Sequence, residues 1–198
     1  MSCYGLAAEF QASRTLGVLG AAKYVVAQRI ERMALAGSRE TARATALDLI
    51  SRSPVLEPSH DELDFAAAIE TAAQRRGLEL DAGESQLAAI VVSRDIGRLE
   101  TGDKRAIQSF DALLDDLSDL QPLSGRLRCL EQIIVSCLQT VDPDLLARAV
   151  CSEPHVDKAL SICFRCYSPQ PYSATLDADG LSSYITALRT CAPRMLEP

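Results

Sequence analysis

The middle of the chain alternates short apolar runs with longer segments of helical periodicity. Residues 55–56 form an apolar pair between two prolines, which predicts a short strand. Ser59 then begins a helix, because Glu62 follows three residues later as in a capping box. The apolar positions of this helix continue to about Arg76, and Gly77 ends it.

The N-terminal region has a mixed pattern. Residues 17–36 predict either a helix or a strand that runs into a helix, because β-branched valines precede apolar positions at helical spacing. Gly37 ends this segment, and Ser38 caps a second helix that stops before Pro54.

Three further elements follow Gly77. Residues 83–94 predict an apolar helix, residues 97–101 a strand, and residues 104–120 a second helix. The second helix carries an acidic run that we assign mostly to its solvent-exposed side: Asp111, Asp115, Asp116 and Asp119. We therefore expect strands and helices to alternate in this part of the chain.

The pattern changes after Pro122 and Gly125, because the remaining segments have helical periodicity and no clear strand. We predict an α/β fold with a small, mostly parallel sheet flanked by helices over residues 1–120. An all-helical C-terminal appendage is predicted over residues 121–198.

Composition narrows the class of protein. The chain has 198 residues, a net charge of −7, and 15 of its 27 acidic residues within residues 57–120. A broad nucleic-acid surface would be basic, so this chain is not expected to have one. We predict no membrane span and no signal peptide, and hence a cytoplasmic protein whose seven cysteines are reduced.

Two carboxylates frame the strand at residues 97–101. Glu84 lies in the first turn of the preceding helix, and Asp103 follows the strand directly. Ligands of open α/β sheets collect at the carboxyl ends of the strands, where carboxylate oxygens suit Mg²⁺ or Mn²⁺. Asp81 is near enough in sequence to join such a site. The alternative is that Asp103 only caps the next helix and Glu84 only suits the helix dipole.

Three neighbouring residues extend the predicted metal site. Thr101 is placed to hold a water or a phosphate oxygen, and Lys104 and Arg105 are placed to contact a phosphate.

This stretch resembles the C-terminal half of a PIN domain. The resemblance rests on Gly83-Glu84-Ser85 opening an alanine-rich helix and on the run Thr101-Gly102-Asp103-Lys104-Arg105 after a strand. PIN domains are metal-dependent nucleases, commonly of RNA, and many bacterial members are toxins of toxin–antitoxin pairs. The resemblance implies a Mg²⁺- or Mn²⁺-dependent endoribonuclease, an antitoxin or other protein partner, and a homodimer.

The resemblance also implies a further acid on an early helix. Glu31 is the first choice for this metal-binding and catalytic role, and Glu40 is the second. PIN domains open with a short apolar strand that ends in aspartate, whereas no aspartate precedes Asp48 here. We expect residues 1–120 to lack that strand, or the strand to lie upstream of Met1. The alternative function is a catalytically inactive, PIN-derived or helical interaction protein.

The C-terminal region has a separate group of metal-ligand residue types. Cys151, His155, Cys163 and Cys166 have the side chains of a zinc site, although their spacing matches no standard pattern. A structural Zn²⁺, a thiol redox role and ordinary core packing of buried cysteines all remain open.

Overall fold

The structure is a computed structural model that describes residues 18–19, 44, 47–48, 51, 54–139, 141–152, 154–155, 157–168 and 174–198. The chain forms two compact units, and each consists of two segments. One unit combines Met1–Glu57 with Ile134–Ser182, and the other combines Pro58–Ile133 with Ser183–Pro198. The candidate site lies in the second unit.

The first unit contains a two-stranded parallel sheet and a pair of contacting helices. Strand β1 (Val18–Leu19) pairs with β2 (Val55–Leu56) in parallel. Helix α8 (Pro143–Cys151) contacts α9 (Lys158–Cys163), and each begins at an aspartate cap. The structure confirms the strand predicted at residues 55–56.

Strand β1 is a short apolar strand that precedes β2 in the sequence, and it is followed by Gly20 rather than by an aspartate. The expectation about the PIN-type first strand stays a prediction.

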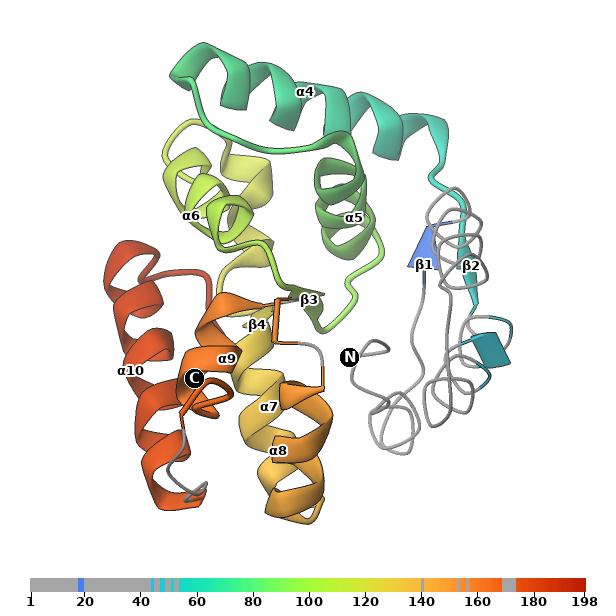
Figure 1. Ribbon diagram of the computed structural model, residues 1–198. Helices are drawn as coiled ribbons and strands as arrows, with labels where there is room; N and C mark the ends of the chain where they lie inside the picture. Colours follow the sequence, from blue (N-terminus) through green and yellow to red (C-terminus); the bar gives the residue numbers. More distant parts are fainter. Residues whose placement is uncertain are drawn as a thin grey trace. The chain divides into compact units, whose positions relative to one another are not determined.

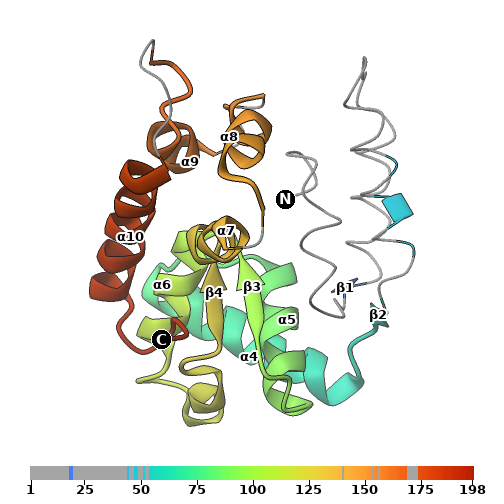
Figure 2. The same cartoon turned by 90° about the horizontal axis from the view of Figure 1, so that it is seen from below.

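The second unit is built around a parallel pair of strands, β3 (Leu99–Thr101) and β4 (Leu127–Cys129). Figure 2 shows their two arrows side by side, pointing the same way. Around them lie helices α4 (His60–Arg76), α5 (Ala82–Ser93) and α6 (Lys104–Leu113) and the 3₁₀ helix η2 (Ser118–Leu123) (Figure 1). Helix α4 contacts both α5 and α6, and α5 contacts β3. The mixed helix-and-strand fold predicted from the sequence is confirmed.

Apolar residues at the predicted periodicity form the core of this unit. The largest fully buried side chains come from every element around the sheet: Ile69, Ile90, Ile107, Phe110, Leu113, Leu120, Leu123 and Leu127. Burial of each such side chain contributes about 1.5–3 kcal/mol to folding. The core therefore stabilises the packing of the helices around β3 and β4.

The end of the chain completes the second unit. Helices α7 (Leu130–Leu138) and α10 (Ala174–Cys191) each have residues in both units. After α10, Leu196 forms a parallel bridge with Leu127 of β4. Arg194 donates to the buried carboxylate of Asp111 and forms an ion pair with Asp115 at 2.7 Å.

Two of the predictions for residues beyond 103 were wrong in detail. The region 121–198 is not all-helical, because β4 is a strand where the periodicity predicts the start of a helix. Residues 183–198 pack with β4 and α6, so the second unit includes residues on both sides of position 120. Asp111 is buried rather than solvent-exposed, because Arg194 neutralises it.

The helices that the structure describes include none with both the length and the apolar character to span a membrane.

An ion pair joins the start of α4 to the end of α5. Ser59 and Glu62 form the predicted capping box. The Glu62 carboxylate also accepts two hydrogen bonds from Arg94, each of 2.7 Å, and is almost completely buried. The hydrogen bond from Arg94 is the main cause that lowers the pKa of Glu62 to about 2. This pair stabilises the α4–α5 packing against which the site is built.

The ion pair predicts acid sensitivity of the fold. Because folding lowers the pKa of Glu62, its contribution is complete above the ordinary value of 4.5 and is lost as the pH falls toward about 2. Glu62→Gln should lower the unfolding free energy by about 2 kcal/mol at neutral pH, because Arg94 loses its charged acceptor. Urea unfolding at a series of pH values measures both effects.

The matched control is Glu70→Gln, which removes a carboxylate from the same helix. If Glu62→Gln and wild type lost stability in parallel from pH 4.5 downward, the pair would not be the acid-sensitive element.

Candidate functional site

The parallel pairing of β3 and β4 brings two chain segments to one edge of the sheet. Thr101 is the register partner of Cys129, so both strands end at the same level. Gly102 and Asp103 follow the first strand, and Leu130 and Glu131 follow the second. The carboxyl edge of this small sheet therefore has an acidic residue two positions after each strand.

Hydrogen bonds connect Glu84 to this edge. The Thr101 hydroxyl donates to Glu84 Oε1 at 3.1 Å and accepts from the Asp103 backbone N–H at 3.0 Å. Glu84 comes from the first turn of α5, and Asp103 caps α6. Thr101 thus connects the Glu84 carboxylate to the backbone of Asp103 through one side chain.

The charge of Glu84 is unfavourable in this setting. Burial raises the pKa of Glu84, and the negative charges of Asp81 and Asp103 raise it further. The Thr101 hydrogen bond acts in the opposite direction. Such a carboxylate gains stability from any nearby positive charge, which a cation would supply.

Asp103 has a structural role of its own. Its Oδ1 accepts from the Arg105 backbone N–H at 2.8 Å, as in a helix cap. The Arg105 guanidinium donates to both of its oxygens and forms an ion pair with Glu79 at 2.5 Å. Burial raises the pKa of Asp103, but the combined contacts of Arg105 outweigh burial and lower it. Asp103 therefore caps α6, and Arg105 is engaged by two carboxylates.

Asp81 is the cap of the neighbouring helix. Its Oδ1 accepts from the Glu84 backbone N–H at 2.9 Å at the start of α5. Its side chain is close enough to Glu84 to affect the pKa of that residue.

Lys104 contacts a residue that sequence reasoning missed. Its Nζ lies 2.5 Å from Oε1 of Glu131, whose side chain is only 1% exposed. The same ammonium lies 5.5 Å from the centre of the Tyr184 ring. Glu131 follows β4 as Asp103 follows β3. If β4 had been predicted as a strand, the matching position of Glu131 would have indicated it as a candidate site residue.

The predicted metal ligands are only partly brought together. Glu84, Asp103 and Asp81 lie around the start of α5 and α6, whereas Glu31 and Glu40 fall outside the described residues. Within the described part of the chain, no group of three His, Cys, Asp or Glu side chains is arranged to hold a metal ion.

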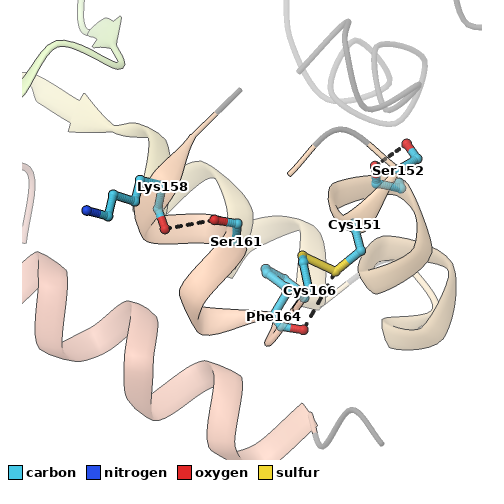
Figure 3. The surroundings of a disulfide bond; sticks show 7 residues. Cys151, Ser152, Lys158, Ser161, Phe164 and Cys166 are labelled. Carbon is cyan, nitrogen blue, oxygen red and sulfur yellow. Dashed lines mark hydrogen bonds between the residues drawn. A yellow bond between two sulfur atoms is a disulfide. The ribbon is translucent and has the colours of Figure 1, made fainter. Parts of the chain in front are cut away.

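The predicted zinc ligands include a disulfide. Cys151 at the end of α8 is bonded to Cys166, which follows α9 (Figure 3). The expectation that all cysteines are reduced is corrected, and these two sulfurs are not thiolate ligands in this form. Cys163 is buried, and a Cβ placed on Gly180 would lie 3.0 Å from its sulfur, while His155 is exposed. The four residues therefore do not form a zinc site here.

Comparison of the chain with family models, with curated proteins and with solved structures found no match.

The Thr101 hydrogen bond yields a test of the site's electrostatics. Thr101→Val should raise the pKa of Glu84 further, because it removes the contact that lowers this pKa. Stability should fall by about 1 kcal/mol, since the Asp103 N–H also loses its acceptor. Carboxyl NMR titration measures the pKa, and Thr101→Ser is the control that keeps the hydroxyl. An unchanged Glu84 pKa in the valine variant would contradict the described link.

The disulfide yields a second test. Cys151 and Cys166 are 15 residues apart, and a bond that closes such a loop contributes about 3 kcal/mol in the chain-entropy account. Dithiothreitol should therefore lower the melting temperature of the wild type but not of the double variant Cys151→Ser/Cys166→Ser. Cys163→Ser should retain the reductant effect. An unchanged wild-type melting temperature would show that the bond does not stabilise the chain.

Proposed function

We propose that this protein is a Mg²⁺- or Mn²⁺-dependent ribonuclease that hydrolyses phosphodiester bonds. The observation that carries the proposal is the half-buried Glu84, linked through Thr101 to Asp103 at the carboxyl edge of parallel strands. This is the edge at which open α/β sheets bind ligands. The excess negative charge that raises the pKa of Glu84 is the condition that a bound cation relieves.

The chemistry of the donor set fits a hard divalent cation. Glu84 and Asp103 would hold it with oxygen ligands, and Asp81 would add negative charge beside them. Mg²⁺ is commonly held by one or two carboxylates, with waters and substrate phosphates completing the shell. Two protein carboxylates therefore suffice for a site of this kind. A bound cation activates water and stabilises charge on the phosphoryl group.

The choice of RNA as substrate rests on the PIN-like run Thr101-Gly102-Asp103-Lys104-Arg105. The acidic charge of residues 57–120 argues against broad nucleic-acid binding, so substrate contact is confined to the edge near Lys104. An antitoxin-type partner and a homodimer are further proposals from the same resemblance.

A non-catalytic interaction module is the second candidate. One observation favours it: Arg105 occupies both oxygens of Asp103, which makes Asp103 a closed helix cap. In that case Glu84 would be a dipole partner of α5, and neither metal nor RNA would bind at the edge.

Metal-dependent RNA cleavage separates the two candidates. Asp103→Asn should reduce Mn²⁺-dependent cleavage at least a hundredfold while preserving the fold, because asparagine caps a helix as well as aspartate does. The measurement is a cleavage time course on single-stranded RNA, with and without EDTA, alongside a thermal melt of each variant.

The matched control is Asp157→Asn, which changes the cap of α9 in the other unit. This variant should cleave like wild type. Equal cleavage by Asp103→Asn and wild type would remove the nuclease proposal in favour of the non-catalytic module.

A further inference from the structure

The buried carboxylate of Glu131 has no role in the proposed metal site. Glu131 is 1% exposed and stands two residues after β4. Lys104 is its ion-pair partner, although neither Glu131 oxygen accepts a hydrogen bond of normal geometry within the described residues. The Cys129 thiol is also close: burial raises its pKa to about 11, and the Glu131 carboxylate adds to that effect. Burying a carboxylate is costly unless a specific contact offsets the loss of water. The contact with Lys104 is therefore the one to explain.

Lys104 is unusually constrained for a lysine. Its ammonium lies between the Glu131 carboxylate and the face of the Tyr184 ring, at 2.5 Å and 5.5 Å, respectively. A free lysine side chain loses rotamer entropy when it binds a ligand, and these two contacts remove part of that freedom in advance. A third of the Lys104 side chain is exposed to solvent.

The position of Lys104 is unfavourable for the helix itself. A cation in the first turn of a helix opposes the helix dipole, and Lys104 and Arg105 both stand there in α6. Arg105 is explained by its contacts with Asp103 and Glu79. Lys104 instead forms an ion pair with Glu131, which stands in the first turn of α7 directly after β4. This ion pair keeps the lysine at the carboxyl edge next to Asp103.

We infer that Lys104 is the phosphate-binding cation of this edge and that Glu131 is the positioning residue that orients it. Arg105 is not a phosphate contact, because two carboxylates already bind it. The inference deepens the proposed function and rests on RNA as the ligand. It adds to that function a specific phosphate contact, Lys104, and a residue, Glu131, that acts only by positioning Lys104.

Binding rather than cleavage tests the inference. The probe is a fluorescein-labelled single-stranded RNA of mixed sequence, with Ca²⁺ in place of Mn²⁺, and a gel that shows that the RNA stays intact. Fluorescence anisotropy gives the Kd at several salt concentrations. Lys104→Met should weaken binding about tenfold and reduce the slope of log K against log salt by about 0.7, the loss of one phosphate contact. Lys158→Met, which removes an exposed lysine from α9 in the other unit, should change neither.

The role of Glu131 is tested by a double-mutant cycle. Glu131→Gln keeps the side-chain shape and should weaken binding severalfold in the wild type but not in the Lys104→Met background. Glu131→Asp, which keeps the charge but withdraws the carboxylate, should fall between wild type and Glu131→Gln. Thermal melts confirm that each variant folds.

The inference would be overturned by the absence of RNA binding by wild type, by wild-type affinity in Lys104→Met, or by equal losses from Glu131→Gln in both backgrounds. Tighter binding by Glu131→Gln would also overturn it, since the carboxylate would then compete with phosphate. If RNA binds through Lys104 but is never cleaved with Mn²⁺, the nuclease proposal fails and the recognition role stands.

Discussion

The parallel pairing of β3 with β4 is the constraint on which the candidate site depends. Leu99 and Leu127, which begin the two strands, are buried in the core and set the register. That register ends both strands together, so the acids that follow them reach one edge. The bridge from Leu196 extends the pairing to the chain end. A shift of β3 by one residue would turn the Thr101 side chain to the opposite face and break its link to Glu84.

The carboxylates at this edge differ in how completely neighbouring cations neutralise them. Arg105 neutralises Asp103, and Lys104 neutralises Glu131. From the described residues of the two strands, Glu84 accepts a hydrogen bond only from the neutral hydroxyl of Thr101. Burial raises the pKa of Glu84. Charge compensation is therefore least complete at Glu84, which makes this residue the centre of the proposed cation site. Lys104, which is held by its ion pair with Glu131, is the proposed contact for an anionic substrate.

The sequence predicted the parts of this arrangement that local chemistry determines. The capping box at Ser59 and Glu62, the end of α4 at Gly77 and the strand before Asp103 all depend on neighbouring residues. Strand β4 was not predicted because it has only three residues, one of them the charged Arg128, and a helix follows it directly. So short a segment shows no clear alternation of apolar and polar residues. The contacts Lys104–Glu131 and Asp111–Arg194 join residues far apart in sequence, and the disulfide depends on how α9 ends. Spacing alone does not determine any of these.

Calorimetric titration of Mn²⁺ into the purified chain tests the central claim most directly, with Glu84→Gln as the comparison. The account predicts one binding event in the wild type that Glu84→Gln abolishes, because Glu84 is the least compensated carboxylate of the edge. In the absence of metal, Glu84→Gln should melt at or above the wild-type temperature, because it removes an unfavourable charge. Absence of binding, or equal binding by the two proteins, would contradict the claim that the carboxyl edge of β3 and β4 is a cation site.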